Sequence, residues 1–191
     1  QVSLYSTVRR FDVSLSPLSP RARLLQYCTD FFDSSMSQQV FLVGGYVTKF
    51  TGKNEKSHKG LQDLIEEAIG ECLRDVCEDD EIERVYVGNF AGELFNKQGH
   101  LGASVSSLHK GLMYKPSHRV EAACASGGIA CSEAIRSIRG SLNDIVLAVG
   151  VEKQSEVDSR TGGKYLARAA DYERQRYVDD FLFPALFARR V

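Results

Sequence analysis

Residues 120–128, Val-Glu-Ala-Ala-Cys-Ala-Ser-Gly-Gly, decide how this 191-residue chain is interpreted. The short run 120–123 predicts a strand, and the apolar spacing over 125–142 predicts a helix directly after it. Cys124 therefore lies at a strand-to-helix junction. The first amides of a helix lack intrahelical partners and the helix dipole is positive there, which favours the nucleophilic thiolate form of a cysteine.

The same backbone amides can bind the oxyanion of a tetrahedral intermediate. We therefore predict that Cys124 is a nucleophile whose backbone N–H lies in an oxyanion hole. The competing interpretation is a buried cysteine at an ordinary strand–helix turn.

The helix after Cys124 has very small side chains in its first turns. Two glycines inside a helix cost about 1 kcal/mol each relative to alanine, so another backbone or a ligand is expected to approach them closely. A helix that is small on nearly every side is expected to be central rather than superficial. The small residues are Ala125, Ser126, Gly127, Gly128, Ala130, Cys131, Ser132 and Ala134.

Outward from this junction, strands and helices alternate along the chain. The last predicted strand is apolar almost throughout, which is typical of a strand buried on both faces of a parallel sheet. The alternation predicts an α/β fold with right-handed crossovers. The further predicted strands are 40–47, 85–88 and 144–151, the further predicted helices are 61–76 and 103–112, and the predicted loop is 90–102.

Three segments are expected along the chain. Residues 39–152 form the α/β core, 153–191 begin an extra, more charged subdomain, and 1–38 form an extension outside the core. Residues 1–29 are rich in Arg and Ser and contain one acid, Asp12, which is typical of an organellar presequence. We expect a mitochondrial location, with a peroxisome or related organelle as the alternative; a disordered extension is the other interpretation.

The composition excludes several classes of function. The formal net charge of -1 favours neither a nucleic-acid nor an anionic-membrane partner, and no apolar run is long enough to span a membrane. The five cysteines show no zinc-ligand spacing, so we predict no metal site. Cys72, Cys77 and Cys131 are expected to be unbridged, buried or half-buried thiols on helices.

Residues 121–130, followed by 144–152, resemble the nucleophile segment of the thiolase family. In that family a strand precedes Cys-x-[Ser/Thr]-Gly, a buried helix and a strand ending in Gly-x-Glu. Residues 87–94 and 98–103 resemble the second strand of the family and the loop behind it, and the details are most similar to sterol-carrier-protein-type thiolases. The resemblance implies the N-terminal βαβαβαββ half of the thiolase fold, a mixed sheet with helices on both faces, followed by the start of an inserted loop domain.

The same resemblance implies an acyltransferase. Cys124 would attack the 3-oxo carbon of a 3-ketoacyl-CoA, acetyl-CoA would leave, and free CoA would take the shortened acyl group from Cys124. The reverse reaction is a Claisen condensation of two acyl-CoAs. Acyl-CoA and CoA are then the substrates, no cofactor is expected to be tightly bound, and a homodimer or tetramer is implied.

The family also uses two histidines and usually a second cysteine, all in motifs of its C-terminal half. Neither a His-Asn-Phe nor a Gly-His-Pro motif is present. We therefore expect this half to be inactive alone and to have its own C-terminal half as a partner. Two alternatives stay open: a ketoacyl-synthase-type or hydroxymethylglutaryl-CoA-synthase-like condensing enzyme, and a non-catalytic thiolase-like protein that binds acyl-CoA or lipid.

Other polar residues carry less specific predictions. His100 lies either at a dimer interface near the site or in an exposed loop, and Glu121 either is structural or tunes Cys124. The basic residues within 160–176 could meet the phosphates of CoA, but the acids among them favour a solvated helix face. No pattern identifies the residues that bind CoA.

Overall fold

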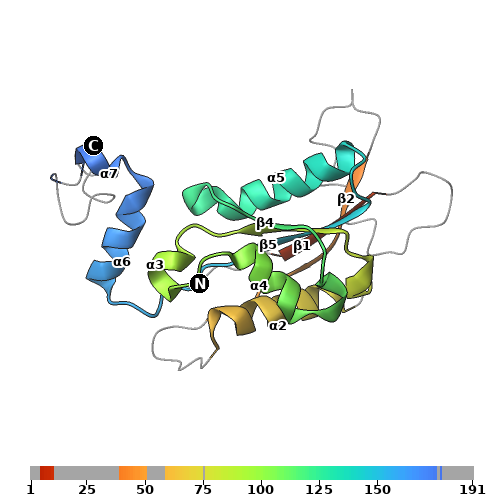
Figure 1. The fold of residues 1–191 in the computed structure, drawn as a ribbon, viewed down its shortest axis with the longest axis horizontal. Coiled ribbons are helices and arrows are strands. Elements are labelled where there is room, and N and C mark those ends of the chain that lie inside the picture. Colours follow the sequence, from red (N-terminus) through yellow and green to blue (C-terminus); the bar gives the residue numbers. More distant parts are fainter. Residues whose placement is uncertain (1–4, 11–38, 51–58, 75, 176, 178–191) are drawn as a thin grey trace.

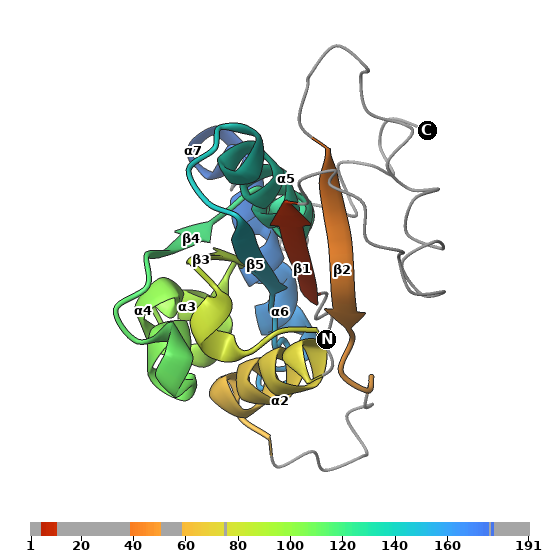
Figure 2. The same cartoon turned by 90° about the vertical axis from the view of Figure 1, so that its right-hand side faces the viewer.

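A computed structural model of the protein describes residues 5–10, 39–50, 59–74, 76–175 and 177. Its centre is a mixed five-stranded sheet in the order β2-β1-β5-β3-β4 (Figures 1 and 2). Strands β3, β4 and β5 run parallel, whereas β1 is antiparallel to both of its neighbours. The strands are β1 Tyr5–Arg10, β2 Val40–Tyr46, β3 Arg84–Gly88, β4 Ser117–Val120 and β5 Ile145–Gly150.

Helices cover both faces of the sheet, with α5 on one face and α2 and α4 on the other (Figure 1). The predicted α/β fold is confirmed. The α-helices are α2 Leu61–Leu73, α3 Gly92–Asn96, α4 Leu101–Leu108, α5 Ser126–Arg139, α6 Ser159–Leu166 and α7 Tyr172–Gln175. The short 3-10 turns are η1 Asp79–Glu81, η2 Lys110–Leu112, η3 Ala123–Ala125 and η4 Ala167–Ala169.

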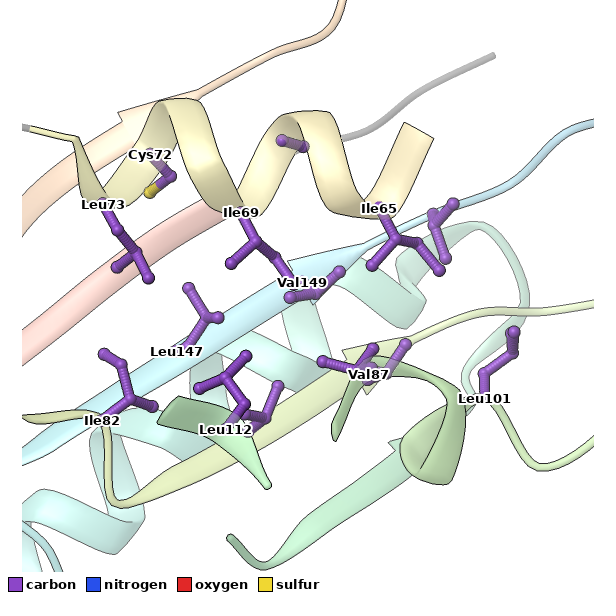
Figure 3. Close-up of a cluster of buried hydrophobic side chains, with 14 of the residues drawn as sticks. Ile65, Ile69, Cys72, Leu73, Ile82, Val87, Leu101, Leu112, Leu147 and Val149 are labelled. Atoms are coloured by element: carbon purple, nitrogen blue, oxygen red, sulfur yellow. The ribbon is translucent and has the colours of Figure 1, made fainter. Parts of the chain in front are cut away.

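Strand β5 separates two hydrophobic layers because its side chains alternate between the faces of the sheet. Leu147 and Val149 pack with Ile65 and Ile69 of α2 in the larger cluster (Figure 3). Val146 and its neighbour Ala148 pack on the opposite face, against the inner side of α5. Burying each large aliphatic side chain contributes about 1.5–3 kcal/mol, so packing rather than helix propensity fixes both helices on the sheet.

The ends of several predicted elements differ in the structure. The predicted strand 120–123 is displaced, because β4 spans Ser117–Val120 and residues 121–123 lie in the turn before α5. The predicted helix 61–76 ends at Leu73. The predicted loop 90–102 contains α3 and the first turn of α4. A local hydrogen bond stabilises the start of α3, because the Asn89 side chain accepts the Gly92 N–H at 3.0 Å.

The N-terminal strand corrects one prediction. Residues 1–38 were expected outside the core, yet Tyr5–Arg10 lie inside the sheet, paired with both β2 and β5. Both neighbours would otherwise present unpaired backbone groups at this position, and Tyr, Thr and Val favour strands. Residues 11–38 lie outside the described residues, so the presequence stays a prediction.

Beyond β5 the chain forms a small helical segment. The Asp158 carboxylate caps α6 by accepting the Arg160 and Thr161 N–H groups, each at 3.0 Å. Tyr165 of α6 stacks edge-on against Phe95 of α3, with ring centroids 5.2 Å apart. This helical segment follows the predicted core, but the predicted boundaries at 39, 152 and 191 stay predictions. No helix in the described part of the chain is long and apolar enough to cross a membrane.

Candidate active site

Cys124 lies where the parallel strands end. Strand β4 stops at Val120, two residues follow, and the η3 turn carries Cys124 directly into α5. The carboxyl ends of β3 and β5 lie at the same edge of the sheet, the usual location of ligand sites in open α/β sheets. Among the described residues the Cys124 thiol is exposed, whereas the competing interpretation expects a buried cysteine.

The turn that presents Cys124 has an uncommon backbone conformation. Ala123 has φ 48°, in the left-handed region that costs a non-glycine residue about 1–2 kcal/mol. Such conformations persist where surrounding contacts over-determine them, and they cluster at functional sites. The backbone is therefore shaped to direct the next residue, Cys124, away from the strand.

Two side chains hold this turn. The hydroxyl of Ser126 accepts the Ala122 N–H at 3.0 Å and donates to the Ala123 carbonyl at 2.7 Å. The carboxylate of Glu121 accepts the Ala123 N–H at 2.5 Å. Both peptide groups around Ala123 are thus fixed by side chains on either side of Cys124.

The outer side of α5 is open in the described part of the chain. A side-chain carbon at Gly127 or Gly128 would meet no atom within 4 Å, so no described residue fills the space on the outward side of these glycines. Ile129 is 37% exposed, and Ala130 and Ile138 of the inner side are buried. α5 therefore packs on the sheet through one side and leaves the other uncovered.

A half-buried carboxylate, that of Glu152, lies after β5 at the same sheet edge. The Glu152 Oε2 atom accepts the N–H groups of Phe90 at 2.9 Å and Ala91 at 3.3 Å, and the Asn89 side-chain amide at 3.2 Å. Its Oε1 atom is buried without a partner among the described residues. Burial raises the pKa of Glu152, while the two backbone donors and Arg119 act in the opposite direction.

Arg119 also binds the segment that follows β3. Its guanidinium donates to the carbonyls of Asn89 at 3.3 Å and Phe90 at 2.7 Å, and to the Glu93 carboxylate at 3.1 Å. Glu152 thus accepts hydrogen bonds from the N–H groups of this turn, and Arg119 donates hydrogen bonds to its C=O groups. Sequence reasoning missed this cluster, although an acid directly after a buried strand was a visible signal.

The remaining predicted residues lie apart from this edge or on its surface. Cys72 is buried on α2, Cys77 lies beyond the end of that helix, and half-buried Cys131 lies on α5. None of the described cysteines forms a disulfide. His100 is exposed at the start of α4, with φ 51°. The structure does not decide between its two predicted roles.

The predicted basic stretch contains exposed residues on α6 and beyond. Arg168 lies over the ring of Tyr172, with its guanidinium carbon 5.3 Å from the ring centre, and Arg174 pairs with Asp171 at 3.6 Å. These contacts are those of a solvated surface. In the described part of the chain, His, Cys, Asp and Glu side chains do not gather in groups of three or more that could hold a metal ion.

Comparison with known proteins identifies the family of this chain. The family model of the thiolase N-terminal domain matches residues 40–187 of the sequence. An acetyl-CoA acetyltransferase of Methanothermobacter thermautotrophicus is 37% identical over 152 residues, which cover 79% of this chain and 38% of the relative. An acetyl-CoA acetyltransferase of Methanocaldococcus jannaschii is 34% identical over 151 residues, covering 79% and 37%.

The chain thus spans less than half the length of both curated relatives. The matched region begins with β2 and includes β3, β4, η3, α5 and β5, so it contains the whole sheet edge described above. The chain belongs to the thiolase family, of which it carries the N-terminal domain.

Proposed function

We propose that this chain supplies the nucleophile of a thiolase-type acyltransferase and that Cys124 carries the acyl group. The observation that supports it most is the exposed thiol on a strained turn between β4 and α5. The first N–H groups of a helix lack intrahelical partners, so the N–H groups of this turn can bind an oxyanion next to the Cys124 sulfur.

In the proposed degradative reaction, the Cys124 sulfur forms a bond to the 3-oxo carbon of a 3-ketoacyl-CoA. The bond between carbons 2 and 3 then breaks, and a proton on carbon 2 completes acetyl-CoA as the leaving group. The sulfur of free CoA next attacks the acyl-Cys124 thioester, which releases the shortened acyl-CoA and restores the Cys124 thiol. The same steps in reverse condense two acyl-CoAs. A closer relationship to sterol-carrier-protein-type thiolases is part of this proposal.

We propose that the outer side of α5 is covered by the C-terminal half of the protein. A groove of about 650 Å³ follows this side of the helix, and its lining includes Gly128, Cys131 and Ile135. Open space around Gly127 and Gly128 leaves room for another backbone. The chain alone is then inactive, because the proton-transfer groups that the reaction needs lie in that other half.

The assembly and location of the protein extend this proposal. A homodimer or tetramer is proposed, for which β4 offers a free edge within the described sheet. CoA is proposed as a substrate, with no tightly bound cofactor. A mitochondrial location, with a peroxisomal one as the alternative, is tested by fusing residues 1–38 to a fluorescent protein; a diffuse cytosolic signal would contradict it.

The test of the chemistry is covalent capture of the acyl group. The complete protein, with its C-terminal half, is incubated with acetyl-CoA or acetoacetyl-CoA, and acyl adducts are mapped by peptide mass spectrometry. We expect an acyl group on Cys124 that is absent from Cys124→Ala and retained by Cys131→Ala, the matched control on the same helix. Absence of any adduct on Cys124 would contradict the proposal and favour the non-catalytic acyl-CoA- or lipid-binding alternative.

A further inference from the structure

We propose that Glu121 is a positioning residue, whose carboxylate holds the turn that presents the Cys124 thiol. This inference deepens the proposed function and rests on it, since Cys124 is taken as the acyl acceptor. It assigns a role to a surface acid that the reaction steps above do not use.

The contact that carries the proposal is local and specific. The Glu121 Oε1 atom accepts the N–H of Ala123 at 2.5 Å, and Ala123 is the residue with the left-handed φ of 48°. Cys124 follows Ala123 directly in the chain. A side-chain oxygen that accepts this N–H stabilises the turn through the hydrogen bond itself, so the contact can hold an unfavourable backbone conformation.

The surroundings of Glu121 indicate that it acts on the turn and not on the stability of the whole fold. Glu121 is exposed, and among the described residues the Ala123 N–H is the partner found for its carboxylate. Ser126, which holds the other side of the turn, is 5% exposed and belongs to the first turn of α5. Ser126 therefore ties the turn to the core, whereas Glu121 acts on the Ala123 peptide alone.

The alternative role for Glu121 is purely electrostatic, since a negative charge near a helix N-terminus is favourable. The variant Glu121→Gln distinguishes the two roles. Glutamine keeps a side-chain oxygen that can accept the Ala123 N–H but removes the charge. A positioning role is therefore rescued by glutamine, and a role of charge alone is not.

The test measures how fast Cys124 reacts with iodoacetamide, which the thiolate attacks with loss of iodide. The complete protein is used, and alkylation of the Cys124 peptide is followed by mass spectrometry. We expect Glu121→Ala to slow the reaction about tenfold, the factor equivalent to one hydrogen bond, and Glu121→Gln to stay within about twofold of the wild type. Glu133→Ala, which removes a surface ion pair with Arg136 on α5, is the matched control and should not change the rate.

A second pair of variants tests the strained backbone. Glycine adopts the left-handed conformation without steric cost, so Ala123→Gly should abolish most of the effect of Glu121→Ala. Thermal unfolding of each variant confirms that it is folded. Equal rates for the wild type and Glu121→Ala, a rate for Glu121→Gln as low as for Glu121→Ala, or an undiminished effect in the Ala123→Gly background would each overturn the proposal.

Alkylation needs neither CoA nor an acyl group, so this test stands apart from the test of the proposed function. If Cys124 forms no acyl adduct while alkylation depends on Glu121 as expected, the acyltransferase proposal fails and the positioning of the thiol by Glu121 stands. If an acyl adduct forms while the alkylation rate does not depend on Glu121, the positioning proposal fails and the acyltransferase proposal stands.

Discussion

A side-chain carbon at Gly88 would lie 2.4 Å from the carbonyl oxygen of Ser126, so the end of β3 and the start of α5 touch backbone to backbone. Strand β3 cannot move away from α5, because Gly88 pairs with Val120 of β4 and with Gly150 of β5. Any side chain at position 88 must therefore displace α5. Cys124 lies two residues before that helix, so the displacement reaches its thiol.

Gly88→Ala is expected to lower the free energy of unfolding by about 1–3 kcal/mol, the usual cost of overpacking a filled site. It is also expected to slow alkylation of Cys124. Urea unfolding and peptide mass spectrometry measure the two effects. Gly162→Ala is the matched control, since its added carbon would meet Phe95 and Val157 only at 3.7 Å. A Gly88→Ala protein as stable as the wild type would contradict the contact.

Ser126→Ala is expected to destabilise the protein by about 1–3 kcal/mol, because it leaves the Ala122 N–H and the Ala123 carbonyl without their shared partner. Chemical denaturation gives the change. The control is Ser107→Ala on α4, where an exposed hydroxyl donates only to the Ser104 carbonyl, and its expected effect is near zero. Similar losses of stability in both variants would show that the Ser126 hydroxyl does not stabilise the turn before α5.

Glu152 predicts a pH dependence of stability. Burial raises its pKa in the folded protein above the ordinary 4.5, so folding favours the protonated carboxyl. Its contribution to stability is therefore fully present below about pH 4.5 and is lost as the pH rises through the folded-state pKa. Glu152→Gln removes this component, so the variant should gain stability relative to the wild type as the pH rises from 4.5.

Urea unfolding of both proteins over this pH range measures the difference in the free energy of unfolding. Glu93→Gln is the control, because its exposed carboxylate also contacts Arg119 but lies outside the buried cluster. Parallel stability profiles for the wild type and Glu152→Gln would contradict the raised pKa.

Thr7→Pro tests the place of β1 in the sheet. Residue 7 pairs with Gly44 of β2 and with Leu147 of β5, and proline cannot donate a backbone hydrogen bond in a central strand. We expect a loss of about 1–3 kcal/mol in the free energy of unfolding. Thr7→Val, which keeps the backbone N–H, is the control. An unchanged stability of the proline variant would mean that this strand does not hold β2 to β5.

The local sequence predicted the elements whose side-chain pattern repeats. The apolar run of β5 and the helical spacing of α2 identified both, because burial on one or two faces imposes a period that the chain itself displays. The junction before α5 identified Cys124 for the same reason, since a strand, a small turn and a helix follow one another directly. The ends of these elements were less predictable, because caps and single tertiary hydrogen bonds decide them.

Contacts between distant segments were decided only by the tertiary structure. Asn89 and Glu152 are 63 residues apart, and the sequence around neither residue predicts its contact with the other. The insertion of Tyr5–Arg10 between β2 and β5 likewise depends on the two strands that flank it, not on its own polar sequence. The sequence by itself predicted Cys124 as the nucleophile and the order of β2, α2, β3, α4, β4, α5 and β5, since these follow from neighbouring residues. The packing of Gly88 on Ser126 and the hydrogen bonds of Glu152 to residues 89–91 were decided by the fold, because they need segments that only the folded sheet brings together.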